Sequence, residues 1–108
     1  RLGLRTGYGR VLAATYLVRL VEQVAEPQTP LPGLYDLLVK ALDYLAEKEP
    51  SRALVERFEW RLAQDLGIAS AEADGAGEKE AARLIEAAFQ RRLPPQRRQL
   101  WDWLNRGA

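Results

Sequence analysis

Apolar residues recur along the chain at the three-and-four spacing of amphipathic helices, in windows separated by proline and glycine. Such spacing places the apolar side chains on one face of each helix. The pattern predicts about five helices, near residues 8–25, 33–47, 51–66, 78–92 and 95–106. No window shows the strict alternation of apolar and polar residues that is typical of a strand. We therefore predict an all-α fold, a single helical bundle domain over residues 1–108.

Individual windows add detail to this prediction. The window 8–25 is apolar nearly all round in its first half, which predicts the most buried helix. Ser51 is a good N-cap for the third helix, and Gly67 stands where a glycine ends it. Small, acidic and glycine residues over 68–77 predict a flexible loop. The clearest helical stripe consists of Leu34, Leu37, Leu38, Ala41, Leu42 and Leu45.

The composition removes several classes of function. Among 108 residues there is no Cys, His or Met, which excludes the usual zinc sites, thiol nucleophiles and imidazole bases. Acid pairs such as Glu22 with Glu26, Asp36 with Asp43 and Glu56 with Glu59 share helix faces, and we interpret them as solvated surface. We predict no metal, no cofactor and no enzymatic activity. No apolar run approaches the 20 or so residues of a transmembrane helix, so we expect a soluble protein without a membrane partner.

Charge is unevenly distributed along the chain. Residues 1–21 carry four arginines and no acid, and residues 90–108 carry five arginines against one acid, whereas acids outnumber bases between them. If the two ends meet in the fold, they form one basic patch for phosphates or an acidic peptide. Solvated helix faces are the alternative interpretation. The opening, without Met or a signal-like segment, is interpreted as part of a longer protein.

The last two windows combine basic and aromatic residues. Arginines neutralise phosphates and carboxylates and tryptophans stack on bases, although arginine at a helix C-terminus and tryptophan in a core are also ordinary. Positions 101 and 103 lie about 200° apart on a helix, so we expect one tryptophan to be buried and the other available for contact. The candidate contacts to DNA or an acidic peptide are Arg91, Arg92, Arg97 and Arg98, with Trp101 and Trp103 as candidate exposed aromatics.

The stretch 8–69 contains a small-residue opening, Ala13-Ala14-Thr15-Tyr16-Leu17, then a proline-rich break and the leucine-rich stretch 34–45. These are followed by Phe58-Glu59-Trp60-Arg61-Leu62 and by Leu66-Gly67-Ile68-Ala69. Together these residues resemble the helical C-terminal domain of the RecO family, which has a Phe-Glu-Leu-Arg-Leu helix with a Leu-Gly-Tyr-small ending. The family's N-terminal OB-fold and four-cysteine zinc module have no counterpart in these residues.

The resemblance implies a cytoplasmic bacterial protein of DNA repair and homologous recombination. It implies binding to the C-terminal tail of single-stranded-DNA-binding protein, to a RecR-like partner and to single-stranded or duplex DNA. The family's pocket for the tail cannot be transferred residue by residue. We therefore predict a non-enzymatic recombination mediator domain. The alternative is a structural or protein-interaction bundle with no nucleic-acid role.

Overall fold

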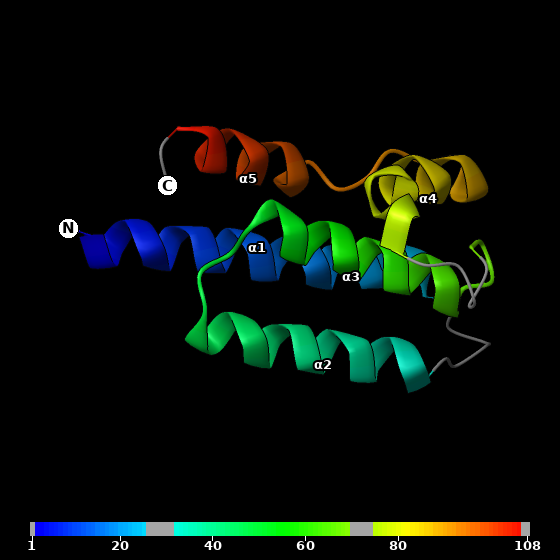
Figure 1. Cartoon of the computed structure of the whole chain (residues 1–108), viewed down its shortest axis with the longest axis horizontal. Coiled ribbons are helices and arrows are strands. Elements are labelled where there is room, and N and C mark those ends of the chain that lie inside the picture. Colours follow the sequence, from blue (N-terminus) through cyan, green and yellow to red (C-terminus); the bar gives the residue numbers. More distant parts are fainter. Residues whose placement is uncertain (1, 26–31, 70–74, 107–108) are drawn as a thin grey trace.

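The computed structural model describes the backbone of residues 2–25, 32–69 and 75–106 and the side chains of residues 7–25, 33–69 and 77–106. These residues form α-helices α1 (Leu2–Val24), α2 (Pro32–Glu47), α3 (Arg52–Asp65), α4 (Ala81–Phe89) and α5 (Gln96–Asn105), with the 3-10 helix η1 (Gly75–Glu80) before α4 (Figure 1). No strand occurs in the described ranges. The all-α prediction is confirmed.

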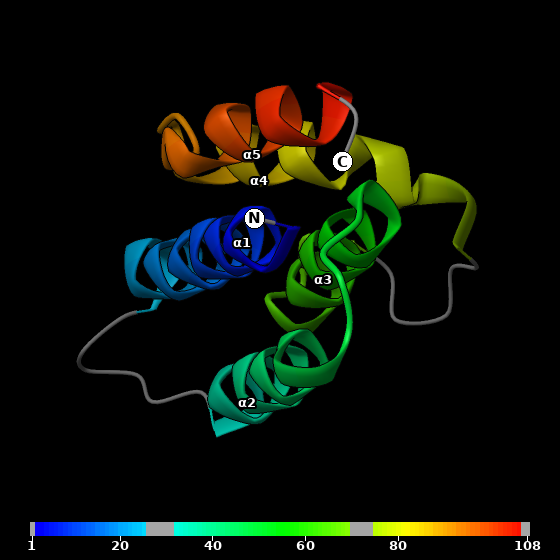
Figure 2. The same cartoon turned by 90° about the vertical axis from the view of Figure 1, so that its left-hand side faces the viewer.

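The helices are stacked in three layers. Figures 1 and 2 show α4 and α5 on one side of α1 and α3, and α2 on the other. α1 contacts both α2 and α5, and it runs antiparallel to each of them. α3 contacts α2, η1 and α4. The middle layer therefore supplies most of the core, with α5 held against it from above.

The core is apolar, and α1 contributes the largest share. Its buried side chains repeat every three or four residues, as the sequence pattern predicts. Tyr8 and Val11, however, are 55% and 65% exposed. α1 contributes more buried residues than any other described helix, as expected, but its first half is not covered all round, because α2 and α5 cover only part of its circumference. The buried residues of α1 are Leu12, Ala13, Tyr16, Leu17, Leu20, Val21 and Val24.

Helix ends follow their local chemistry. The Ser51 hydroxyl accepts a hydrogen bond from the N–H of Leu54 at 3.1 Å, and Gly67 follows α3 with φ 78°. α4 ends at Phe89, three residues before the predicted end, since Gln90 takes a left-handed conformation with φ 53°. α1 begins at Leu2 rather than Tyr8, although the glycines in its first turns disfavour a helix.

The segment predicted as a flexible loop is only partly described. Residues 70–74 lie outside the described residues. From Gly75 the chain forms η1, which contacts α3, so its last residues are not a flexible loop. A Cβ atom at Gly77 would lie 2.7 Å from the ring of Trp60, so only glycine permits this close approach. Because Gly77 has no side chain, η1 can pack directly against Trp60 of α3.

No helix in the described part of the chain is both long and apolar enough to span a membrane.

Candidate binding groove

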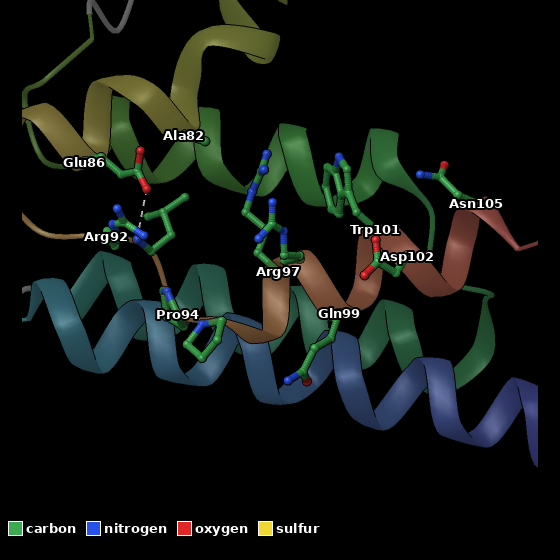
Figure 3. A pocket seen from close by; sticks show the side chains of 12 residues that line it. Ala82, Glu86, Arg92, Pro94, Arg97, Gln99, Trp101, Asp102 and Asn105 are labelled. Atoms are coloured by element: carbon green, nitrogen blue, oxygen red, sulfur yellow. Dashed lines mark hydrogen bonds between the residues drawn. The ribbon is translucent and has the colours of Figure 1, made fainter.

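A groove of about 1020 Å³ lies between α4 and α5 and along the connection that joins them (Figure 3). Its apolar lining includes Leu93, Pro94 and the ring of Trp101. Three arginines and two acids also line it. The complete lining is Ala82, Glu86, Arg92, Leu93, Pro94, Pro95, Arg97, Arg98, Gln99, Trp101, Asp102 and Asn105.

The connection between α4 and α5 is fixed by hydrogen bonds on two sides. Pro94 and Pro95 lack an N–H, so the chain cannot continue as one helix from α4 into α5. The N–H of Leu93 donates to Glu86 Oε2 at 3.1 Å, drawn in Figure 3, and Gln23 Nε2 donates to the Arg92 carbonyl at 2.8 Å. The connection is thus attached to both α4 and α1, which preforms the floor of the groove.

A buried network holds α5 beneath the groove. The Glu59 carboxylate is 0% exposed and accepts hydrogen bonds from two helices. Arg97 donates from Nε to Oε2 at 2.6 Å and from Nη2 to Oε1 at 3.1 Å, and the Tyr16 hydroxyl donates to Oε2 at 2.5 Å. A buried carboxylate is tolerated only when it is paired and hydrogen-bonded in this way. The network therefore joins α1, α3 and α5 at one point.

This network shifts two pKa values. Burial, reinforced by the negative charge of Glu59, raises the pKa of the Tyr16 phenol well above its ordinary range. Burial alone would lower the pKa of the Arg97 guanidinium, but the hydrogen bonds and charge of Glu59 outweigh it and raise that pKa. Tyr16 therefore stays a neutral donor and Arg97 a cation around the carboxylate.

Two guanidinium groups lie over the ring of Trp101. Arg97 lies over its ring at 4.2 Å from the ring centroid, and Arg52 of α3 lies at 5.0 Å. Both distances are within the range of a cation–π interaction. Since Arg97 is itself fixed by Glu59, the orientation of the aromatic wall follows from the buried network.

The structure separates the six candidate residues of the sequence analysis. Arg92, Arg97, Arg98 and Trp101 line the groove together. Arg91 lines instead an adjoining hollow of about 510 Å³, which Arg92 shares, as does Arg19 of α1.

Trp103 lies away from both hollows. A Cβ atom on Gly9 of α1 would lie 2.5 Å from its ring, so the ring rests on the glycine backbone. Trp101 and Trp103 are both partly buried, against different helices.

The two basic ends of the chain meet only in part. Arg19 joins the C-terminal arginines around the adjoining hollow. Arg10 lies elsewhere, since its Nε donates to the Lys48 carbonyl at the end of α2 at 3.4 Å. The side chains of Arg1 and Arg5 lie outside those that the structure describes. A basic patch thus forms around the connection between α4 and α5, with one arginine from the N-terminal segment.

Sequence reasoning missed the residue that organises the site. Interpreting Glu59 as a solvated surface acid is wrong, since it is completely buried. A signal was present in the spacing, because Glu59 lies four residues after Val55 and three before Leu62, on the apolar stripe of α3. Among the other acids, Glu22, Asp36 and Asp43 are exposed, as expected of a solvated surface. Glu56 is half-buried, and Glu26 lies outside the described residues. Across the ranges that the structure describes, no three His, Cys, Asp or Glu residues are grouped to hold a metal ion.

Comparison with known proteins decides the family. The family model for the recombination protein O C terminal matches residues 5–92. The chain belongs to the RecO family. Three DNA repair proteins RecO illustrate the similarity: one from Neisseria gonorrhoeae is 35% identical over 69% of this chain, one from Neisseria meningitidis is 37% identical over 64%, and one from Pseudomonas putida is 32% identical over 55%.

The matched RecO proteins are longer than this chain. The aligned residues cover 31%, 27% and 26% of those three relatives. No solved structure gave a significant match. The chain is therefore a RecO-family DNA repair domain, and the family match ends at Arg92, before α5 begins.

Proposed function

We propose that this domain docks the acidic, hydrophobic C-terminal tail of single-stranded-DNA-binding protein in the groove between α4 and α5. The observation that carries the proposal is the pairing of an apolar wall with free positive charge. Leu93, Pro94 and Trp101 offer the apolar surface, and Arg92 and Arg98 make no ion pair with any described residue. A peptide with both carboxylates and large apolar side chains complements this lining.

The other charged groups of the groove are already engaged or lie on its rim. Arg97 is neutralised by Glu59, so we assign it to positioning Trp101 rather than to ligand charge. Glu86 accepts the N–H of Leu93. Asp102 is exposed on α5 and would repel an acidic ligand at that point. The carboxylates of the tail are therefore expected beside Arg92 and Arg98.

Family membership supports the same partner. RecO relatives are DNA repair proteins, and a docking module for a single-stranded-DNA-binding protein brings such a protein to damaged sites. We propose a binding module for recombinational repair rather than an enzyme, with a RecR-like partner remaining a prediction. The alternative, a structural bundle without a nucleic-acid role, predicts no ligand for the groove.

Fluorescence anisotropy of a labelled tail peptide tests the proposal. We expect saturable binding that a scrambled peptide lacks, and a loss of about tenfold in affinity for Arg92→Glu and for Arg98→Glu. Arg61→Glu is the matched control, because Arg61 is exposed on α3 and does not line the groove. Equal affinity of all three variants, or equal binding of the scrambled peptide, would reject the groove as the docking site.

A second candidate function is attraction of DNA phosphates to the adjoining hollow. Arg19, Arg91 and Arg92 gather there against Glu22 alone. Three cations around one acid favour an anionic ligand without selecting a sequence. We propose that this hollow contributes electrostatic, sequence-independent affinity for single-stranded DNA.

A further inference from the structure

A largely apolar face lies across α1 and α2, and its central hollow shares no lining residue with the groove between α4 and α5. On α1 it consists of Val11, Thr15 and Val18, spaced four and three residues apart. On α2 it consists of Tyr35, Val39 and Leu42, also spaced four and three residues apart. Each set shares one side of its helix. These six residues are called the α1–α2 face below.

The two rows meet at one end of each. A hollow of about 400 Å³ is lined by Thr15 and Val18 together with Leu42, which are the residues nearest the C-terminal end of their rows. Because α1 and α2 are antiparallel and contact each other, the rows continue in opposite directions from this point (Figure 1). The face is therefore continuous across both helices.

The α1–α2 face is exposed to an unusual degree for apolar side chains. Val11 is 65%, Tyr35 54% and Val39 55% exposed. Of the large hydrophobic residues that the structure records as exposed, only Leu84 lies outside α1 and α2. Isolated exposed apolar residues are ordinary, but a contiguous patch over two helices is typical of an interaction site.

One edge of the face is acidic. Asp36, Asp43 and Glu47 are exposed on α2, and the first two stand three and four residues from Val39 on the solvent side of the helix. None of the three makes an ion pair with a described residue, and Lys40 is the one base among them. Glu22 and Arg19 both line the hollow and offset each other in charge, so the excess of acid comes from α2. The edge therefore carries a net negative charge that a partner can neutralise.

We propose that the α1–α2 face docks a basic amphipathic helix of a partner protein. A helix laid along the groove between two antiparallel helices buries a stripe of side chains spaced three and four residues apart. Basic side chains beside that stripe reach the acids of α2, which fixes the orientation of the docked helix. The required chemistry is opposite in sign to that of the groove between α4 and α5, so the two surfaces select different ligands.

The probe for this proposal is a synthetic peptide of about 18 residues, five turns of helix, made of leucine and lysine in an amphipathic pattern. Its controls are a peptide with glutamate in place of each lysine and a scrambled leucine–lysine peptide. Binding is measured by isothermal titration, and the contact surface is mapped by amide chemical shifts in the folded 108-residue chain. We expect saturable one-to-one binding of the amphipathic leucine–lysine peptide only, with shifts confined to α1 and α2.

Matched substitutions distinguish specific binding at the α1–α2 face from nonspecific binding of the peptide. We expect Asp43→Lys and Val39→Ser each to reduce affinity for the leucine–lysine peptide by about fivefold or more. Glu80→Lys and Leu84→Ser make the same chemical changes at exposed positions in the layer on the other side of α3, and we expect them to leave the affinity unchanged.

Three results would overturn the proposal. The first is equal binding of the glutamate or scrambled peptide. The second is shifts centred on α4 and α5. The third is self-association of the chain in sedimentation velocity that Val39→Ser abolishes, because the occupant would then be a second copy. None of these three results depends on whether the groove between α4 and α5 binds the tail peptide. Failure of the proposed function can therefore be distinguished from failure of the docking proposal for the α1–α2 face.

Discussion

At the scale of single residues, Glu59 determines how the site is held. Its removal leaves Arg97 as a partly buried cation and deprives the Tyr16 hydroxyl of its acceptor. Breaking one partner out of a buried ion pair costs about 3 kcal/mol or more. We expect Glu59→Ala to lower the free energy of unfolding by roughly that amount, measured by urea denaturation. A loss below about 1 kcal/mol, comparable to an exposed ion pair, would contradict this account.

Tyr16 gives the same network a dependence on pH. The pKa of its phenol is raised in the folded state, so the folded protein keeps a proton that the unfolded chain releases above about pH 10. The stabilisation is complete below that pH and is lost as the pH rises further. We expect the unfolding free energy to decrease above pH 10 more steeply for the native sequence than for Tyr16→Phe. Parallel curves for the two proteins would show that Tyr16 does not titrate on unfolding.

At the scale of elements, substitutions at two glycines of α1 distinguish the effect of helix propensity on stability from the effect of packing against α5. A Cβ atom at Gly7 would have no neighbour within 4 Å, whereas one at Gly9 would lie 2.5 Å from the Trp103 ring. Alanine is favoured over glycine in a helix by about 1 kcal/mol. We therefore expect Gly7→Ala to raise the thermal midpoint of unfolding and Gly9→Ala to lower it. Stabilisation by both substitutions would mean that α5 does not rest on the backbone of α1.

Most of the elements could be predicted from the sequence, because helical stripes, prolines and capping residues act locally. Ser51 and Gly67 mark the ends of α3 as predicted. The left-handed turn at Gln90 could not be predicted, because it is a glycine-like conformation at a residue with a side chain. The candidate site was only partly predictable. Its arginines form a cluster that is visible in the sequence. Which of them is used in an ion pair could not be predicted, because the partner of Arg97 is Glu59, 38 residues away in the chain.

At the scale of the whole molecule, the arginines around the adjoining hollow predict a strong dependence of DNA binding on salt. Three phosphate contacts by Arg19, Arg91 and Arg92 would weaken single-stranded DNA affinity by about tenfold to twentyfold between roughly 50 and 200 mM salt. Filter binding across that range measures how steeply the DNA affinity falls with salt concentration. Replacing Arg91 and Arg92 by alanine is expected to make this dependence weaker. An affinity independent of salt, or unchanged by these substitutions, would exclude the hollow as a DNA site.

The molecule as a whole presents surfaces of opposite character on its two outer layers. The layer of α4 and α5 carries the basic groove, and α2 carries an apolar row with an acidic edge. Figure 2 shows these two layers on opposite sides of the middle layer. The middle layer holds α5 through Glu59 and Gly9, and it holds η1 through Trp60. The two proposed ligands would therefore occupy separate surfaces of this RecO-family domain.

The central claim is that the groove between α4 and α5 binds an acidic, hydrophobic tail. The most direct measurement is the anisotropy titration of the labelled C-terminal tail of single-stranded-DNA-binding protein against the native chain and Arg98→Glu. The account predicts saturable binding to the native chain, absent for the scrambled peptide and about tenfold weaker for the variant. Absence of tail binding by a chain that circular dichroism shows to be folded and helical would contradict it.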